Sequence, residues 1–265
     1  MRTEIKNGVA ILWDCLQELK NIPDGSIDAI ICDLPYGATQ HTADKIIPFA
    51  PMWSEVERVI KDNGAILFFA QGIFYVDLVA SNRRLFRYDL VWDKVLTTGF
   101  LNAKRLPLRQ HEQIAVFYKH PPVYNPQFKV GKPSHWQWTK RFEKEMANRN
   151  YGSYTPIVSE KDPTLKYPTS IFQYPKTHPS KALHRTEKSI PLLKELIQTY
   201  SNEWDTILDF TAGSLTLAVA AEDTGRKWIY IEQDEECCSD WITRLNVTDN
   251  VPTPQWDRQL LIPNL

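Results

Sequence analysis

The sequence lacks the features that mark several classes of protein. Its four cysteines match no spacing of zinc ligands and no disulfide framework, and two of them, Cys237 and Cys238, are adjacent. No apolar run approaches the length of a membrane span, and residues 1–8 lack the apolar core of a signal peptide. We therefore expect reduced, structural cysteines, no metal, no membrane segment and a soluble, cytoplasmic protein.

Net charge is also nearly absent, because 31 Lys and Arg residues balance 32 Asp and Glu residues to give −1. The balance hides an asymmetry: residues 119–183 hold 11 basic and 4 acidic side chains, a net charge of +7, which leaves −8 on the rest. Prolines and rings are interspersed with these cations; the rings include His135, Trp136, Trp138, Phe142, Tyr151 and Tyr154. Such a segment suits a surface that follows a phosphate backbone. A solvated loop region with a few anchoring aromatic side chains explains the composition equally well.

The 265 residues, 43% of them apolar, are enough to bury a core as one domain with an inserted subdomain. Short apolar runs alternate with segments of helical periodicity, which is typical of a parallel sheet covered by helices. The patterns predict strands at 9–13, 29–33, 65–70, 88–92, 114–118, 205–209 and 228–231, and helices at 51–60, 73–80, 190–200 and 217–223.

The strand at 29–33 opens into the segment Asp33, Leu34, Pro35, Tyr36. Pro35 stops a helix and favours an extended backbone before it, so Asp33 lies at the carboxyl end of a buried strand, where ligands bind in open α/β sheets. A carboxylate and a Tyr ring there can hold a flat base that carries an amine: the acid accepts a hydrogen bond from the amine, and the ring stacks on the base. An acidic strand end followed by a proline turn is the simpler alternative.

A second strand, residues 205–209, leads through a turn of small residues into a helix, and the next strand stops at Glu232. This is a nucleotide-binding βαβ unit, in which the turn lets a cofactor approach the backbone and the acid can bind two ribose hydroxyls. A NAD-dependent oxidoreductase uses the same unit but needs glycines at G-x-G-x-x-G spacing, and this turn has only Gly213. The turn favours a cofactor without phosphates, such as S-adenosylmethionine.

These two segments resemble motifs of the DNA amino-methyltransferases, which methylate the exocyclic amine of adenine or cytosine. Residues 33–36 resemble the catalytic Asp-Pro-Pro-Tyr, with Leu34 in place of the first proline; a leucine still offers the carbonyl that accepts the second hydrogen bond of the amine. Residues 209–216 resemble Asp-x-x-x-Gly-Ser-Gly-Thr, with Leu215 in place of the second glycine.

A third segment, residues 184–189, resembles the family pattern His-Pro-Thr-(Glu or Gln)-Lys-Pro, with Arg185 and Ser189 in place of the prolines. It precedes the predicted helix at 190–200, so Thr186 and Ser189 can alternatively serve to cap that helix. The order of the motifs is that of the β-class. It implies an α/β fold: one Rossmann-like, S-adenosylmethionine-dependent methyltransferase domain with a mostly parallel sheet of the seven-stranded type, helices on both faces and an antiparallel hairpin at the end of the sheet. In that division, residues 1–118 are the catalytic part, 119–183 an inserted target-recognition region and 184–265 the cofactor-binding part.

The resemblance also implies roles for individual residues. The catalytic set is Asp33, Leu34, Pro35 and Tyr36, and the cofactor-binding set is Asp14, Thr186, Lys188, Asp209, Phe210, Thr211, Gly213, Ser214 and Glu232. The DNA-binding set is Lys104, Arg105 and Arg109 from a loop, with Trp136, Trp138, Lys140 and Arg141 from the insertion. Asp14 has a helix N-cap as its alternative role. His111 and Glu112 are expected only to start a strand, because an amine that attacks a sulfonium can lose its proton late and to water.

The function implied is site-specific methylation of adenine N6 in double-stranded DNA, with the target base flipped out of the duplex. Adenine is favoured over cytosine because an Asp-initiated motif usually accompanies adenine in the family. Three alternatives stay open: methylation of cytosine N4, a DNA-binding homologue with weakened catalysis, and methylation of RNA. A homodimer and a role in restriction-modification are compatible with the resemblance, and the recognition sequence is not predictable from it.

Overall fold

The computed structural model describes residues 2–37, 44–132, 146–148, 152–154, 162, 164–176 and 188–238. The chain divides into two compact units, one of Met1–Asn125 with Ser170–Leu265 and one of Pro126–Thr169. The first unit is built on a sheet of nine strands in the order β1-β2-β13-β12-β3-β4-β6-β5-β11. The strands are β1 (Arg2–Ile5), β2 (Gly8–Leu12), β3 (Ile27–Asp33), β4 (Ile60–Ala70), β5 (Phe86–Thr98), β6 (Arg109–Phe117), β11 (Ile171–Gln173), β12 (Thr206–Asp209) and β13 (Lys227–Glu232).

Most neighbouring strands in this sheet run parallel. β3 is central and pairs in parallel with both β12 and β4. β6 runs antiparallel to β4 and β5, and β1 runs antiparallel to β2. The expected mostly parallel sheet and its antiparallel hairpin, β5 and β6, are therefore confirmed. β1 and β11, which the sequence patterns did not predict, add one strand to each edge of a seven-stranded core.

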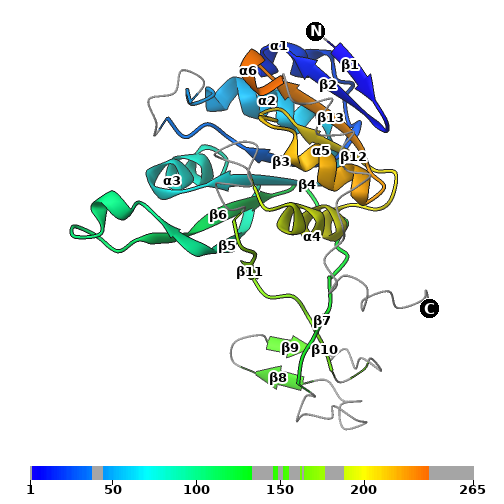
Figure 1. Cartoon of the computed structure of the whole chain (residues 1–265). Coiled ribbons are helices and arrows are strands. Elements are labelled where there is room, and N and C mark those ends of the chain that lie inside the picture. Colours follow the sequence, from blue (N-terminus) through cyan, green and yellow to red (C-terminus); the bar gives the residue numbers. More distant parts are fainter. Residues whose placement is uncertain are drawn as a thin grey trace. The chain divides into compact units, whose positions relative to one another are not determined.

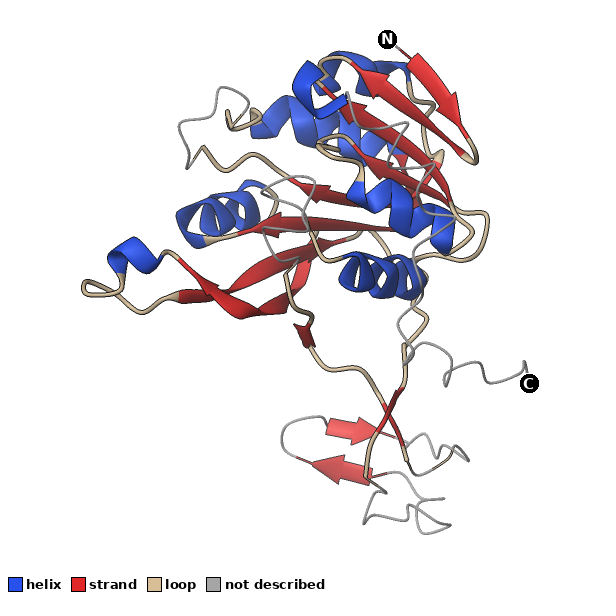
Figure 2. Cartoon of the chain, in the orientation of Figure 1, coloured by secondary structure: helices blue, strands red, loops and turns tan. Residues whose placement is uncertain are grey.

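Helices cover both faces of the sheet (Figures 1 and 2). One face packs against α1 (Cys15–Glu18), α2 (Phe49–Val59) and α3 (Gly72–Ser81), and the other against α4 (Ile190–Tyr200) and α5 (Thr216–Asp223). The short helices η1 (Leu19–Asn21), η2 (Phe100–Asn102) and α6 (Glu235–Cys238) lie in connections. Alternate side chains of β3 enter the two cores: Ile31 faces α4 and α5, whereas Ile30 and Cys32 face α2. Strands that are buried on both faces have continuous apolar sequences, and this is why the sequence pattern predicted them well.

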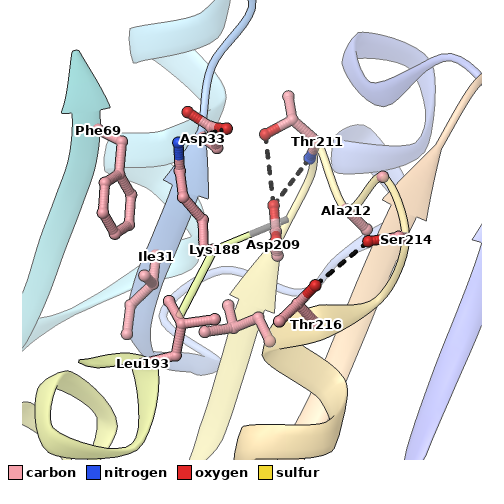
Figure 3. A pocket seen from close by; sticks show the side chains of 12 residues that line it. Ile31, Asp33, Phe69, Lys188, Leu193, Asp209, Thr211, Ala212, Ser214 and Thr216 are labelled. Carbon is pink, nitrogen blue, oxygen red and sulfur yellow. Dashed lines mark hydrogen bonds and ion pairs between the residues drawn. The ribbon is translucent and has the colours of Figure 1, made fainter. Parts of the chain in front are cut away.

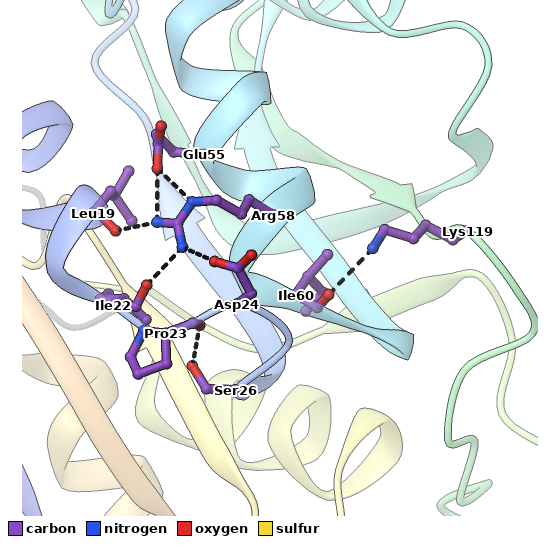
Figure 4. Close-up of polar contacts among 9 residues, drawn as sticks. All are labelled: Leu19, Ile22, Pro23, Asp24, Ser26, Glu55, Arg58, Ile60 and Lys119. Atoms are coloured by element: carbon purple, nitrogen blue, oxygen red, sulfur yellow. Dashed lines mark hydrogen bonds and ion pairs between the residues drawn. The ribbon is translucent and has the colours of Figure 1, made fainter.

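Arg58, near the end of α2, fixes the loop that leads into β3 (Figure 4). Its guanidinium donates to the backbone carbonyl oxygens of Leu19, at 2.7 Å, and Ile22, at 2.8 Å, and it pairs with the carboxylates of Asp24 and Glu55. Guanidinium groups suit such multiple contacts because their five N–H donors stand in a rigid fork. The clamp holds the start of the strand whose other end carries Asp33.

Within its described residues, the second unit contains two short antiparallel pairs of strands. β7 (Lys129–Val130) pairs with β10 (Leu165–Lys166), and β8 (Met146–Asn148) pairs with β9 (Gly152–Tyr154). This unit spans fewer residues than the insertion expected at 119–183. At its C-terminal end, β11 already belongs to the large sheet. At its N-terminal end, Asn125 still contacts the first unit, because it donates its backbone N–H to the carbonyl oxygen of Thr199 in α4, at 2.8 Å. Among the described residues, no helix is long and apolar enough to cross a membrane.

Candidate active site

A pocket opens at the carboxyl ends of the central parallel strands, the edge at which ligands bind in open α/β sheets. Its walls come from β3, β4, the turn after β12, and the N-terminal parts of α4 and α5 (Figure 3). The lining residues are Ile31, Asp33, Phe69, Lys188, Leu193, Asp209, Thr211, Ala212, Gly213, Ser214, Thr216 and Leu217. The pocket thus brings Asp33, from the motif predicted to be catalytic, and the small-residue turn together with Lys188 from the segment before α4.

Asp33 ends β3 at one side of this pocket. The hydroxyl of Tyr36 donates to Oδ1 of Asp33 at 2.8 Å, and the Tyr36 ring packs against Phe74 of α3 with centroids 5.1 Å apart. The side chain of Leu34, 3% exposed, is buried in the core on the α2 and α3 face. The substitution of leucine for proline therefore fills the core behind the site and leaves the pocket free of the leucine side chain.

Lys188 lies directly against the Asp33 carboxylate. Its ammonium Nζ is 2.8 Å from Oδ2 of Asp33 and 2.8 Å from Oε2 of Glu112, and Lys94 Nζ is 3.1 Å from Oε1 of Glu112. The ammonium also lies 4.9 Å from the centre of the Phe69 ring, a distance that permits a cation–π contact. The result is a chain of alternating charges, from Asp33 through Lys188 and Glu112 to Lys94.

Burial and charge compete within this chain. Burial raises the pKa of Asp33, and the neighbouring Lys188 ammonium opposes that rise. Burial alone would also raise the pKa of Glu112, but Lys188 and Lys94 together bring it down to about 2. The pKa of Lys188 is raised, because its two carboxylate partners outweigh the effect of burial. Lys188 and Glu112 therefore both carry charge at neutral pH.

The opposite side of the pocket is built around Asp209, the last residue of β12. Asp209 is 6% exposed and accepts hydrogen bonds from the backbone N–H of Thr211, at 3.0 Å, and from its hydroxyl, at 3.3 Å. The next residue, Phe210, donates its N–H to Sγ of Cys32 at 3.4 Å. Because burial outweighs these hydrogen bonds, the pKa of Asp209 rises to about 7.

Two residues of the turn have left-handed backbone conformations, Gly213 with φ 50° and Leu215 with φ 57°. An added Cβ at Gly213 would meet no atom within 4 Å, so this glycine leaves open space beside the pocket. Leu215 adopts a conformation that favours glycine, the residue that the family has there, yet its side chain is fully buried in the core with α4. The turn therefore keeps its shape despite the substitution.

Glu232 ends β13, and Asp14 comes two residues after the neighbouring strand β2. Oε2 of Glu232 accepts the N–H of Gly213 at 2.7 Å, and Oε1 accepts the N–H groups of Gln233 and Asp234. Asp14 caps α1 by accepting the N–H of Gln17 at 2.9 Å, so its capping role is confirmed. Neither acid lines the pocket itself, and their proposed contacts with the cofactor stay predictions.

Other predicted residues lie elsewhere. Lys104, Arg105 and Arg109 are exposed in and after the loop that joins β5 to β6, away from the pocket lining. Thr186, Trp136, Trp138, Lys140 and Arg141 lie outside the described residues. Conversely, the ion pairs of Glu112 and Lys94 were not predicted, because Glu112 was expected only to start a strand. Both residues lie just outside the strands predicted at 88–92 and 114–118, in the parts by which β5 and β6 extend beyond those predictions.

The polar groups around the turn suit a cationic cofactor without phosphates. The N–H of Gly213, the kind of group that cradles a pyrophosphate, is already bonded to Glu232. The two acids in contact with the turn, Asp209 and Glu232, would in their ionised forms repel phosphate and attract the positive charges of S-adenosylmethionine.

Known proteins agree with this arrangement. The family model for N6/N4 methyltransferases, described as DNA methylase, matches residues 27–243. The DNA adenine methyltransferase YhdJ of Escherichia coli (strain K12) is 26% identical over 257 residues, which cover 89% of this chain and 82% of YhdJ.

Solved structures show the same fold. The PvuII DNA methyltransferase (cytosine-N4-specific) superposes with a TM-score of 0.63 at 15% identity, covering 96% of this chain and 90% of that one. The M1.HpyAVI–SAM complex superposes with a TM-score of 0.57 at 19% identity, covering 89% and 98%. The chain belongs to the N6/N4 DNA methylase family and is an S-adenosylmethionine-dependent DNA methyltransferase that acts on the exocyclic amine of adenine or cytosine.

Proposed function

We propose that this enzyme methylates N6 of adenine in double-stranded DNA at a specific sequence. The observation that carries the proposal is the carboxylate of Asp33, which is bonded to Tyr36 and already accepts an N–H donor, the Lys188 ammonium, at 2.8 Å. The base assignment is supported by the aspartate that begins the motif, which in the family usually accompanies adenine, and by the relative YhdJ, which is named an adenine methyltransferase.

The residues of the pocket account for the chemistry as follows. The amine of adenine is a poor nucleophile because its lone pair is delocalised into the ring. Hydrogen bonds from that amine to Asp33 and to the carbonyl of Leu34 favour a pyramidal nitrogen, and the Tyr36 ring, turned towards the flipped base, stacks on it. Catalysis is then mainly orientation, without a metal or a covalent intermediate.

S-adenosylmethionine, when bound, supplies an electrophilic methyl group on a sulfonium. The residues proposed to hold it are Asp14, Thr186, Lys188, Asp209, Phe210, Thr211, Gly213, Ser214 and Glu232. Of these, Asp209 and Thr211 to Ser214 line or form the pocket turn, and Glu232 shapes that turn through Gly213.

DNA recognition is proposed for two regions. The insertion at 119–183 carries the excess of positive charge and would act as the target-recognition region, with Trp136, Trp138, Lys140 and Arg141 at the DNA. Lys104, Arg105 and Arg109 would contact phosphates from the exposed connection between β5 and β6. Residues 1–118 and 184–265 would supply the catalytic and cofactor-binding parts.

Methylation of cytosine N4 is the second candidate, because the fold also matches the PvuII enzyme, which is named cytosine-N4-specific. A homologue with weakened catalysis is a weaker candidate, since the side chains of Leu34 and Leu215 both turn into the core and leave the pocket free.

Transfer of tritium from methyl-labelled S-adenosylmethionine to polymer tests the proposal. We expect label in duplex DNA and none in RNA, and chromatography of the digested DNA should show N6-methyladenine. Label in N4-methylcytosine would instead support the second candidate. The absence of any label, with cofactor binding intact by calorimetry, would favour the weakened homologue.

A further inference from the structure

The Lys188 ammonium occupies a place that resembles the one required of the target amine. It points an N–H donor at Oδ2 of Asp33 from 2.8 Å, lies in the pocket lining, and has the Phe69 ring 4.9 Å away. Since Tyr36 already donates to Oδ1, each oxygen of Asp33 has a donor before any base arrives. A carboxylate that is paired with a cation is a weaker acceptor for a neutral amine, so this contact opposes catalysis if it persists.

Glu112 offers the ammonium an alternative partner. Its Oε2 is as close to Lys188 as Asp33 is, 2.8 Å in each case, and its side chain is 12% exposed, against 31% for Asp33. Lys94, 4% exposed, holds the other oxygen of Glu112 at 3.1 Å and so fixes the carboxylate in place. Lys188 can therefore leave Asp33 and stay paired, which avoids the cost of an unpaired buried charge.

We propose that Lys188 is a placeholder for the target amine at Asp33, and that Glu112, anchored by Lys94, is the positioning residue that retains the ammonium when the amine takes its place. The inference rests on the proposed function, because it assigns the arriving donor to the exocyclic amine of a flipped base. In the free enzyme the placeholder keeps the Asp33 carboxylate ionised and directed at the pocket.

The charged groups around Asp33 make the proposal testable by pH. The Asp33 carboxylate interacts with Tyr36 in the loop that follows it, with Lys188 before α4 and with Glu112 on β6. Asp209 at the end of β12 also interacts with it electrostatically. Lys94 acts through Glu112, and Lys176 after β11 is close enough to interact with Asp33 as well. Of these groups, Lys188 lowers the pKa of Asp33 and Glu112 raises it.

The test is the pH profile of kcat/KM for DNA at saturating cofactor, whose acid limb reports the essential carboxylate of the free enzyme. Lys188→Met should move that limb to higher pH by about one unit, so that activity below it falls about tenfold. Glu112→Gln should move it to lower pH and lower kcat as well, because the ammonium then stays on Asp33. Asp223→Asn is the matched control: it breaks another lysine–carboxylate pair, with Lys194 at 3.0 Å between α4 and α5, and should leave the limb in place.

The proposal would be overturned if Lys188→Met and Glu112→Gln fold normally, lose activity equally at every pH and leave the acid limb in place. The ion pairs of Asp33, Lys188, Glu112 and Lys94 would then have a structural role. The ¹³C signal of the Asp33 carboxyl, identified by its loss in Asp33→Asn, gives a readout independent of methyl transfer. If the wild type transfers no methyl group to DNA, the proposed function fails. Opposite shifts of the Asp33 titration in the two variants would then still support the control of Asp33 by Lys188 and Glu112, and unmoved titrations would refute it.

Discussion

Each of the two sides of the pocket has an aspartate at the end of a parallel strand, but the two aspartates have different partners. Asp33 and Asp209 end the neighbouring parallel strands β3 and β12, and burial raises the pKa of both carboxyl groups. Asp33 is paired with the Lys188 ammonium, whereas the hydrogen bonds to Asp209 come from the uncharged donors of Thr211.

The difference follows from what each side is proposed to receive. A cationic cofactor gains from a carboxylate that no neighbouring cation neutralises, and its positive charge would in turn favour the ionised form of Asp209, whose pKa is about 7 in the cofactor-free protein. A neutral amine instead needs a carboxylate that is held ionised and correctly directed, the state that we propose Lys188 maintains at Asp33 until the amine takes its place. Substitutions on each side can test this division of roles, beginning with the one of largest expected effect.

Asp33→Ala should abolish methyl transfer, a loss of at least about 10²-fold, because it removes the group that orients the amine. Cofactor affinity in calorimetry should change little, since all the proposed cofactor residues that line the pocket except Lys188 lie on the Asp209 side. Asp33→Asn keeps the shape of the side chain and serves as the matched variant. Simultaneous loss of cofactor affinity and activity in both variants would show that the two sides are not separable.

Glu232→Ala should weaken S-adenosylmethionine binding about 10- to 100-fold, the cost of hydrogen bonds to a charged group. Because Glu232 also accepts the N–H of Gly213, Glu232→Gln is needed beside it: it retains an acceptor for the turn but lacks the charge. Glu222→Gln is the control: Glu222 lies in the last turn of α5, at the opposite end from the pocket, and accepts hydrogen bonds from Asn7 and Trp228. Unchanged affinity in both Glu232 variants would remove this residue from the ribose.

Asp209→Asn should stabilise the cofactor-free protein in a pH-dependent way. The folded-state pKa of Asp209, about 7, lies above its ordinary value, so the protonated form favours folding at low pH and this contribution is lost as pH rises through 7. The asparagine side chain of the variant mimics the protonated form and can still accept from Thr211. The free energy of unfolding of the variant should match the wild type near pH 4 and exceed it by about 2–4 kcal/mol at pH 8. A constant difference in denaturant titrations across that range would contradict the assignment.

Much of the fold was predictable because its signals are local. The apolar run that ends at Asp33 and the small turn at Gly213 each specify a strand and a loop within about ten residues, whereas the roles assigned to them stay predictions. The sheet arrangement and the cofactor followed from the resemblance; the structural matches confirm the first, and the family match supports the second.

The network at Asp33 was not predictable, because it depends on pairing across the fold. Glu112 and Lys188 are 76 residues apart in sequence, and Glu112 was expected only to start a strand. Their contact arises where the antiparallel strand β6 passes the segment that enters α4. Likewise, the left-handed Leu215 departs from its usual preference because its side chain gains burial in the core, a tertiary effect that local propensity does not reveal.

The smallest expected effect concerns DNA binding, for which two basic regions of the chain are candidates to contact the phosphates. If the insertion follows the DNA backbone, replacing Lys140 and Arg141 together by Ala should flatten the log–log dependence of DNA affinity on salt by roughly one to two units, about one for each phosphate that is no longer neutralised. Cofactor affinity should not move. The matched variant replaces Lys104 and Arg105 by Ala in the exposed connection between β5 and β6.

Replacing residues that only position the backbone should weaken affinity evenly across DNA sequences, whereas replacing base-reading residues, for which Trp136 and Trp138 are candidates, should relax specificity. An unaltered salt slope in the Lys140 and Arg141 double variant, combined with a flattened slope in the Lys104 and Arg105 variant, would move the phosphate contacts from the insertion to the β5–β6 connection. Flattening in both variants by about the same amount would instead mean that the two regions hold different phosphates of one DNA site, since each phosphate contributes separately to the slope.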